Sequence, residues 1–235
     1  MDEEHRTVVD EDDEAERAPE PLSPGEGAIA GLPGATYVSR ALSPAFAYRL
    51  ARNAGKVGVK PARYGITGKG GPKVLPYGSR LAYPDWLEEL VDRLQALGAM
   101  QKRPTQVSVN HYVPHPEPYR LVPHIDSNTG QQVVIVSLLS YCCLDFYRNS
   151  GRKDLSVLDP EDTREPAVSL LLEPGSALIL TGEAYREFGH GIAPRLTDEV
   201  STELGNYHLL TSLDKSATTT TTRSARISLA LWSPE

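Results

Sequence analysis

The feature that most constrains the fold is a series of short apolar runs, separated by turn residues, in the second half of the chain. Residues 107–113 alternate apolar and polar side chains, whereas residues 133–139 form a continuous apolar run. Four further runs follow at residues 142–147, 168–172, 177–181 and 226–232, and Glu173-Pro174-Gly175-Ser176 predicts a tight turn between two of them. No helical pattern alternates with these runs, so we predict antiparallel strands arranged as a sandwich or an open barrel.

Two amphipathic stretches precede these strands and predict helices. After a short strand at residues 35–38, Ser43 can cap a helix that runs to Arg52, with Pro44 in its first position. Between residues 84 and 98 the apolar side chains fall on one helical face, and Gly98 ends the pattern. Such a stripe is typical of a helix that packs on a sheet. The predicted fold class is therefore α+β, mainly β with flanking helices packed on one sheet.

Charge divides the chain into an acidic tail and a nearly neutral body. The formal net charge is −7, but residues 1–26 alone carry eleven acidic residues and two arginines, which leaves the rest at +2. The acidic composition therefore neither supports nor excludes a nucleic-acid substrate. We predict a disordered acidic tail over residues 1–33 and one folded domain over residues 34–235. Polar segments at residues 148–166 and 195–224 are predicted as loop insertions, the second with a mobile tip at its threonine run.

Other features restrict the location and the partners of the protein. No apolar run approaches the roughly 20 residues that span a bilayer, and the acidic N-terminus lacks the pattern of a signal peptide. Cys142 and Cys143 are adjacent, so they cannot join distant segments, and they lack the spacing of a metal knuckle. We therefore expect an intracellular monomer, in the cytoplasm, the nucleus or both, without membrane contact.

Three side chains predict a metal site. His124 and Asp126 are two residues apart, so on a strand they point to the same side. His190 follows much later in the chain, between Gly189 and Gly191, which permit close approach of the backbone. Two neutral imidazoles and one carboxylate are the ligand set that holds non-haem Fe(II) and leaves positions open for a cosubstrate and oxygen.

Alternatives to this metal site stay open. A His-x-Asp pair occurs often by chance, and a cupin-like sandwich with a structural metal would need a fourth protein ligand that the sequence does not show. His111 and His115 are four residues apart, but Pro114 and Pro116 prevent the helix that would align them. We interpret His111 as a packed or surface histidine on a strand, and His208 as part of a loop.

Polar residues on two predicted strands suggest an anion pocket beside the metal. Arg226 and Ser228 share one face of the last strand, and Asn110 and Tyr112 share one face of an earlier strand. An arginine fork matches the distal carboxylate of a 2-oxo diacid, and an amide and a phenol can donate hydrogen bonds to it. Each residue alone also fits a half-buried polar group, but their order along the chain favours a site.

The order Asn-x-Tyr, His-x-Asp, His and Arg-x-Ser resembles that of the AlkB family of Fe(II)- and 2-oxoglutarate-dependent dioxygenases, most closely its eukaryotic AlkB homologue 6 group. The resemblance covers about residues 104–235 and extends more weakly back to about residue 35. Its segments are Val109-Asn110-His111-Tyr112, Pro123-His124-Ile125-Asp126, Ile135-Val136-Ser137-Leu138, Leu144-Asp145-Phe146-Tyr147, Leu170-Leu171-Leu172-Glu173-Pro174-Gly175-Ser176, His190-Gly191-Ile192 and Arg226-Ile227-Ser228-Leu229.

This resemblance implies a double-stranded β-helix (jelly-roll) core and an Fe(II) site without catalytic residues beyond the metal ligands. The implied iron ligands are His124, Asp126 and His190, and the implied 2-oxoglutarate pocket consists of Asn110, Tyr112, Arg226 and Ser228. The resemblance also implies O2 as a second cosubstrate and alkylated DNA or RNA as the partner. The implied reaction is oxidative demethylation or hydroxylation.

The chain departs from the family pattern at two places. The last strand of the family carries a second arginine six residues after the first, where this chain has Trp232, and Arg223 is out of phase for the same face. The alternative function is therefore a catalytically weakened or inactive AlkB-like protein that binds metal or nucleic acid as an interaction protein. The loop at residues 65–78, where relatives contact substrate, has few aromatics, which leaves Tyr64 and Tyr77 as candidates for stacking on a base.

Overall fold

The structure is a computed structural model that describes residues 19–57, 73–75, 82–114, 118–126, 130–149 and 165–234. Helices and strands alternate in the N-terminal part of the described chain, and strands dominate from residue 106 onward. The elements are β1 (Ala35–Val38), α1 (Pro44–Ala54), β2 (Lys73–Leu75), α2 (Asp85–Ala96), β3 (Gln106–Tyr112), β4 (Leu121–His124), β5 (Gln132–Leu138), β6 (Cys142–Arg148), β7 (Val168–Leu172), β8 (Ala177–Thr181), α3 (Gly182–Arg186), β9 (Phe188–Ile192), β10 (Thr197–Glu199), η2 (Tyr207–Leu209), β11 (Thr220–Thr222) and β12 (Arg226–Ser233).

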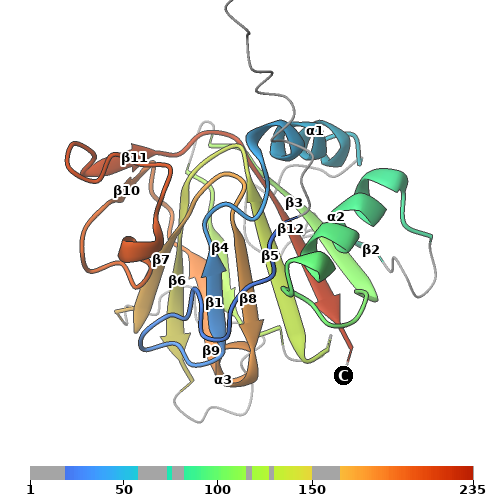
Figure 1. Cartoon of the computed structure of the whole chain (residues 1–235). Coiled ribbons are helices and arrows are strands. Elements are labelled where there is room, and N and C mark those ends of the chain that lie inside the picture. Colours follow the sequence, from blue (N-terminus) through green and yellow to red (C-terminus); the bar gives the residue numbers. More distant parts are fainter. Residues whose placement is uncertain are drawn as a thin grey trace, which may run out of the picture.

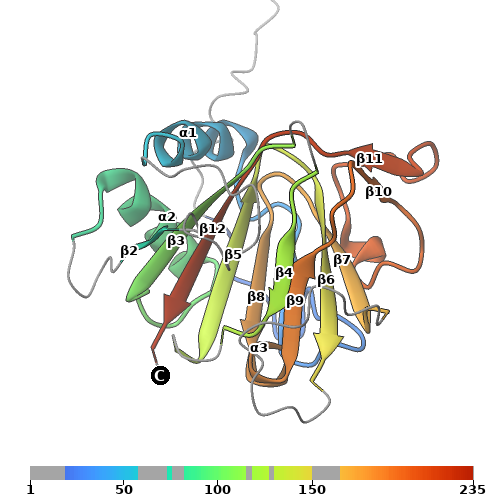
Figure 2. The same ribbon diagram turned by 180° about the vertical axis from the view of Figure 1, so that it is seen from behind.

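Two antiparallel sheets face each other and form the body of the protein (Figures 1 and 2). The larger sheet has the order β1-β8-β5-β12-β3-β2, and the smaller sheet has the order β4-β9-β6-β7. Helices α1 and α2 cover the outer face of the larger sheet, whereas the smaller sheet lies on the opposite side (Figures 1 and 2). This arrangement confirms the predicted mainly β fold with helices on one sheet, and it is that of a double-stranded β-helix.

Side-chain alternation along the strands separates two buried apolar clusters. On β12, Ile227, Leu229 and Leu231 pack with the buried faces of α1 and α2. Ala230 and Trp232 point to the other side and belong to the cluster between the two sheets. Because successive residues of a strand face opposite sides, Arg226 and Ser228 lie on the same inner face of β12 as Trp232. The space between the sheets is therefore where the polar residues of β3 and β12 meet.

Both predicted helices are present, with boundaries close to those expected. The hydroxyl of Ser43 accepts a hydrogen bond from the backbone N–H of Phe46 at 3.3 Å, and Pro44 occupies the first turn of α1. Helix α2 ends just before Gly98, whose φ of +75° lies in the left-handed region that favours glycine. No helix in the described part of the chain has the length and the apolar character of a membrane span.

The packed domain begins earlier than the predicted boundary at residue 34. Ile29 and Leu32 are buried in the cluster between the sheets, and the backbone N–H of Leu22 donates to the carbonyl of Leu97 at 3.0 Å. The backbone N–H of Tyr37 also donates to the carbonyl of Gly27 at 2.8 Å. A few isolated apolar residues thus anchor a segment that its composition suggested was disordered. Residues 1–18 of the predicted tail lie outside the described residues.

The second predicted insertion, residues 195–224, is a packed segment rather than a loop with a mobile tip. Strands β10 and β11 pair with each other, and the predicted tip contributes residues 220–222 to β11. Between them, the buried side-chain amide of Asn206 bonds to both the backbone N–H and the carbonyl of Leu171. Irregularly spaced apolar residues, among them Val200, Leu204 and Leu210, also pack into the cluster between the sheets, so the segment is held without apolar periodicity. Most of the first predicted insertion, residues 150–164, lies outside the described residues.

Candidate metal centre and adjoining anion pocket

The three predicted metal ligands converge between the sheets. Strands β4 and β9 are neighbours, and His124 lies directly opposite His190 in their pairing. The two imidazole centroids are 4.6 Å apart. The Asp126 carboxylate lies 3.4 Å from Nε2 of His124 and 3.8 Å from Nε2 of His190. Within the described ranges, this is the one group of three or more His, Cys, Asp or Glu side chains arranged to hold a metal ion.

The backbone around the triad explains two local features of the sequence. A Cβ atom at Gly191 would lie only 2.8 Å from the carbonyl oxygen of Leu121, so β9 and β4 approach closely only because this residue is glycine. Asp126, predicted on the same strand as His124, instead lies two residues beyond the end of β4. There its carbonyl accepts a hydrogen bond of 2.6 Å from the hydroxyl of Tyr185 on α3, which holds Asp126 beside the histidines without strand pairing.

The protonation states of the triad fit a divalent metal. Nδ1 of His124 lies 3.0 Å from the carbonyl of Val122, and an N–H donated there leaves the Nε2 lone pair for a metal. Burial, with a smaller effect of His124, lowers the pKa of His190 to about 4, so this ring is neutral at physiological pH. Burial alone would raise the pKa of Asp126, but the neighbouring His124 and then His190 lower it below its usual value.

The donor set therefore suits Fe(II) with positions left for other ligands. Two neutral nitrogens and one carboxylate oxygen are the facial ligand set of non-haem Fe(II) oxygenases. A structural metal would require a fourth protein ligand, and the described residues offer only these three. The cupin-like alternative with a closed metal site is not supported by this geometry.

The predicted anion pocket also assembles. Arg226 pairs with Tyr112, and Ser228 pairs with Asn110, in the register of β12 and β3. The side-chain amide of Asn110 donates to the hydroxyl of Ser228 at 3.3 Å. The guanidinium of Arg226 lies over the ring of Tyr112, 5.1 Å from its centroid. All four predicted residues thus line one region between the sheets.

Arg226 is the strongest indication that this region binds an anion. The residue is 2% exposed, and its Nε donates to the hydroxyl of Ser137 on β5 at 3.0 Å. In the part of the chain that the structure describes, no carboxylate lies within ion-pair distance of it. A buried cation without a counter-charge costs several kcal/mol, so the pocket fits a ligand with a carboxylate.

Trp232 lies at the other end of β12 from this pocket. Six residues separate it from Arg226, which corresponds to roughly 20 Å along the strand. The indole is buried, and its N–H is close enough to the Asp126 carboxylate to lower the pKa of that group, although the indole nitrogen forms no well-aligned hydrogen bond to a described residue. The tryptophan therefore stands beside the metal ligands, and not beside the guanidinium that would hold a distal carboxylate.

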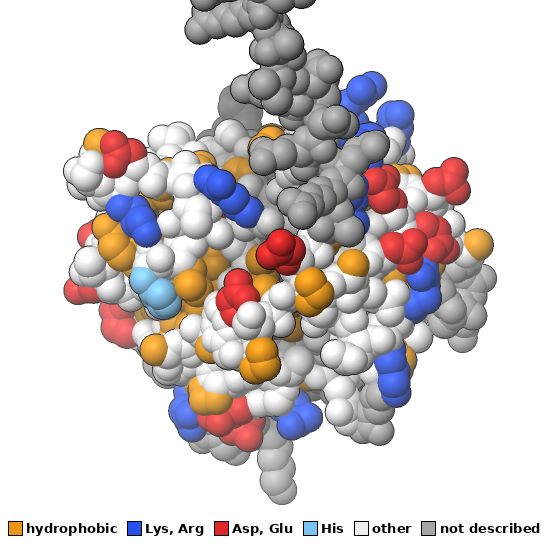
Figure 3. All heavy atoms as spheres, viewed as in Figure 1, with side chains coloured by type: hydrophobic (Ala, Val, Ile, Leu, Met, Phe, Trp, Pro, Cys, Tyr) orange, Lys and Arg blue, Asp and Glu red, His pale blue; other side chains and the backbone are white. Residues whose placement is uncertain are grey.

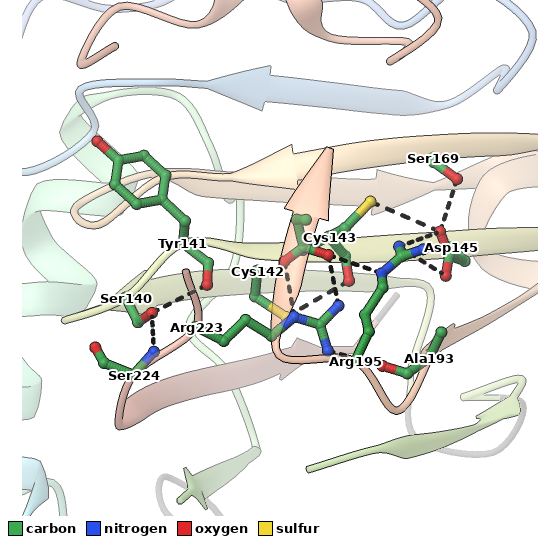
Figure 4. A network of polar contacts seen from close by, with 11 residues as sticks. Ser140, Tyr141, Cys142, Cys143, Asp145, Ser169, Ala193, Arg195, Arg223 and Ser224 are labelled. Carbon is green, nitrogen blue, oxygen red and sulfur yellow. Dashed lines mark hydrogen bonds and ion pairs between the residues drawn. The ribbon is translucent and has the colours of Figure 1, made fainter. Parts of the chain in front are cut away.

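Arg223 belongs to a separate polar cluster that the sequence did not predict (Figure 4). Its guanidinium donates to both carboxylate oxygens of Asp198, at 2.7 and 2.6 Å, and to the carbonyl of Ala193. Arg195 reaches the same carboxylate at 2.8 Å and lies 3.4 Å from Asp145. Arg223 and Asp198 are 25 positions apart, so no local sequence pattern predicts this ion pair.

The remaining candidates are either elsewhere or not described. Tyr64 and Tyr77, the predicted substrate contacts, and His115 lie outside the described residues. His111 alternates with Asn110 and Tyr112 on β3 and therefore points to the helix side of the larger sheet, as predicted for a packed histidine. His208 lies on η2, away from the triad.

Comparison with known proteins agrees with this site. The family model of the 2OG-Fe(II) oxygenase superfamily matches residues 70–231. The Danio rerio protein named "Probable RNA/DNA demethylase ALKBH6" is 32% identical over 150 residues, which cover 63% of this chain and 61% of that protein. The Mus musculus "tRNA (carboxymethyluridine(34)-5-O)-methyltransferase ALKBH8" is 28% identical over 131 residues, which cover 54% of this chain and 16% of that protein.

A solved structure shows the same fold. The structure of OsALKBH1 superposes with a TM-score of 0.50 at 17% identity, covering 86% of this chain and 98% of that chain. The chain spans less than two thirds of the length of the curated relatives it matches. The family match nevertheless covers most of the chain and includes the triad and Arg226. The chain belongs to the 2OG-Fe(II) oxygenase superfamily, whose members are enzymes that use Fe(II), 2-oxoglutarate and O2.

Proposed function

We propose that this oxygenase oxidises an alkyl group on a nucleic acid, with oxidative demethylation of DNA or RNA as its reaction. The observations that carry the proposal are the facial triad and the buried Arg226, which has no carboxylate partner among the described residues. The similar Danio rerio protein, named a probable RNA/DNA demethylase, supports this substrate class.

The side chains of this protein would bind and orient the reactants. His124, Asp126 and His190 would hold Fe(II), and Arg226 with Ser228, Asn110 and Tyr112 would hold the distal carboxylate of 2-oxoglutarate. Fe(II), when bound with 2-oxoglutarate and O2, supplies the oxidation of a substrate C–H bond to C–OH, with release of succinate and CO2. An N-methyl group oxidised in this way leaves as formaldehyde.

Two neighbours of the triad position it for this reaction. The carbonyl of Val122 fixes the tautomer and the orientation of His124. The hydroxyl of Tyr185 holds the backbone of Asp126. Burial of His190 keeps its ring neutral, so no proton competes with the metal at physiological pH. These contacts preorganise the ligands without direct participation in the chemistry.

The nucleic acid would approach away from the helix-covered face. On that face acidic and basic side chains are interspersed (Figure 3). Arg49 forms an ion pair with Glu89, and Arg103 forms ion pairs with Glu88 and Asp92. Arginines whose charge is already balanced make a weak phosphate-binding surface. The substrate would therefore enter where the triad opens between the sheets.

Product analysis tests the proposal. The purified chain would be incubated with Fe(II), ascorbate, 2-oxoglutarate and N-methylated single-stranded or duplex oligonucleotides. We expect succinate and formaldehyde in equal amounts from the parent, and neither product from Asp126→Ala. A matched control is Asp92→Ala, an exposed residue of α2, which should retain activity. Metal and oligonucleotide binding without succinate would favour the alternative, a catalytically inactive interaction protein with Trp232 beside the metal.

Location and assembly are part of the same proposal. We propose a monomer in the cytoplasm, the nucleus or both, and the two unpaired cysteines, both buried, fit a reducing compartment. Light scattering on the purified chain and cell fractionation would test these two statements separately.

A further inference from the structure

A second buried phenol adjoins the anion pocket, and nothing in the predicted site uses it. Tyr119 lies two residues before β4 and is 1% exposed. Its ring centroid is 5.1 Å from that of Tyr112, at an interplanar angle of 49°. The guanidinium of Arg223 lies over the same ring, 5.4 Å from its centroid. The ring therefore contacts both a residue of the pocket and a residue of the cluster of Arg223 and Asp198.

The hydroxyl of Tyr119 forms no well-aligned hydrogen bond in the part of the chain that the structure describes, and the polar group next to it is the thiol of Cys142, a weak acceptor. A buried hydroxyl is normally satisfied, because an unmade hydrogen bond there is unfavourable. Burial, followed by the nearby Cys142 thiol, raises the pKa of Tyr119 well above its ordinary value, so the hydroxyl remains a donor. The ring of Tyr112 contacts both the ring of Tyr119 and the guanidinium of Arg226, at 5.1 Å in each case, so the phenol lies near Arg226.

The pocket therefore contains two groups that each lack a complement. One is the guanidinium of Arg226, which has no carboxylate partner among the described residues, and the other is the hydroxyl of Tyr119. A carboxylate has two oxygens and can accept from a guanidinium and a phenol at once. A single ligand carboxylate accepts from both groups and balances the charge of Arg226, whereas a water molecule leaves that charge uncompensated.

We propose that the hydroxyl of Tyr119 donates a hydrogen bond to the distal carboxylate of 2-oxoglutarate, opposite Arg226, and so helps to bind the cosubstrate. Arg223, which cannot reach that carboxylate while it is paired with Asp198, positions the ring of Tyr119 by a cation–π contact. This inference rests on 2-oxoglutarate as the cosubstrate, and it does not depend on which substrate is oxidised.

Direct binding measurements test the role of Tyr119 without turnover. The full chain would be loaded with Mn(II) in the absence of oxygen, and its Kd for 2-oxoglutarate would be measured by calorimetry. The same titration, at millimolar concentrations, would use 2-oxopentanoate, in which a methyl group replaces the distal carboxylate. The variant is Tyr119→Phe, which removes only the hydroxyl. The control is Tyr37→Phe, because the Tyr37 hydroxyl is already paired with the Glu173 carboxylate at 2.9 Å.

The expected result separates binding from a structural role. Tyr119→Phe should weaken 2-oxoglutarate about tenfold, the effect of one hydrogen bond to a charged group, and should leave 2-oxopentanoate unchanged. Without ligand, this variant should unfold at the same or a higher temperature than the parent, because it loses an unpaired hydroxyl. Tyr37→Phe should lower the unfolding temperature and leave both Kd values unchanged.

Three results would overturn the inference. One is a Kd of Tyr119→Phe for 2-oxoglutarate within twofold of the parent value. Another is an equal loss of affinity for both 2-oxo acids, which would mean a general distortion of the pocket. The third is a parent that binds 2-oxopentanoate as tightly as 2-oxoglutarate, which would mean that no distal carboxylate is recognised. The proposed demethylation of nucleic acid could still hold in the first two cases, so the two proposals fail separately.

Discussion

Arg223 and Arg226 are three residues apart and equally buried, yet their surroundings are opposite. Arg223 donates to both oxygens of Asp198 and to a backbone carbonyl, so its charge is balanced within the chain. Arg226 has a serine hydroxyl and the face of a tyrosine ring, and no carboxylate among the residues that the structure describes. A buried charge that the chain itself neutralises has a structural role, because removal of either partner leaves an uncompensated charge, whereas a buried charge without a partner predicts a ligand.

The positions of Trp232 and Arg226 show why the anion pocket keeps its arginine although Trp232 replaces the second arginine of the family pattern. The structure places Trp232 next to Asp126, at the metal end of β12, while Arg226 stays at the far end. The absence of a cation at position 232 therefore affects the surroundings of the metal site more than the residues proposed to bind the distal carboxylate of 2-oxoglutarate. The phenol of Tyr119 offers a neutral donor beside the ring of Tyr112.

The largest expected effect on stability comes from removing the charge of Asp198 in its ion pair with Arg223. Asp198→Asn leaves the buried Arg223 with an uncompensated charge, and we expect it to lower the free energy of unfolding by about 3 kcal/mol. Urea denaturation followed by circular dichroism measures this change. The matched control is Asp92→Asn on α2, an exposed ion-pair partner of Arg103, which should change stability by less than about 0.5 kcal/mol. Equal effects of the two changes would contradict the structural role assigned to Asp198.

Removal of the Arg226 charge should have the opposite effect: it should preserve the stability of the protein and weaken the binding of 2-oxoglutarate. Arg226→Met replaces an uncompensated buried cation with an apolar side chain of similar length, so the unliganded protein should be as stable as the parent or more stable. Affinity for 2-oxoglutarate should fall about a hundredfold, or roughly 2.7 kcal/mol. Calorimetry and thermal unfolding on the same sample measure both quantities. A strongly destabilised variant with unchanged affinity would show that Arg226 is structural.

Acid should weaken the balanced pair. Burial would raise the pKa of Asp198, but the hydrogen bond and the charge of Arg223 lower it below the ordinary value of 3.8. Because the folded-state pKa is depressed, the contribution of this carboxylate is present above about pH 4 and is lost as the pH falls through the folded-state value. The stability difference between the parent and Asp198→Asn should therefore shrink between pH 5 and about pH 2. A difference that is independent of pH would argue against an ionised Asp198.

The smallest expected effect concerns the metal end of β12. Trp232→Phe keeps a buried ring but removes the N–H beside the Asp126 carboxylate. We expect metal affinity to fall by up to about tenfold, which is typical for loss of a group that orients a ligand, and 2-oxoglutarate affinity at saturating metal to change little. Titration with Mn(II) followed by electron paramagnetic resonance measures the metal affinity. A large loss of 2-oxoglutarate affinity would place the indole in the cosubstrate pocket instead.

Local patterns predicted the longer strands, helices α1 and α2, and the ligands that lie on strands, whereas the short strands β2, β10 and β11 lie in segments that were predicted as loops. Strand alternation was enough to place Asn110 with Tyr112 and Arg226 with Ser228, because each pair is two residues apart. The triad also followed from short spacing plus one distant histidine. These features depend on one residue type at a fixed interval, which a single sequence displays.

Features held by long-range polar contacts were not predictable in this way. Asp198 and Arg223 form an ion pair across a segment that lacks apolar periodicity, and that lack of periodicity predicts a loop. Ile29 and Leu32 are two apolar residues in a polar stretch, and only the fold shows that they are buried. Tyr119 follows no strand pattern, and its importance rests on a missing hydrogen bond, which is a property of the three-dimensional arrangement alone.

The pairing of His124 with His190 has a consequence for the dynamics of the smaller sheet. Strand β4 is the edge strand of that sheet, and its pairing with β9 is irregular between Leu121 and His124. A metal ion bound by one histidine from each strand would connect β4 to β9 through their side chains. This connection would add to the few backbone hydrogen bonds between the two strands. Metal loading should therefore slow amide exchange along β4, which makes the order of this edge a measure of metal occupancy.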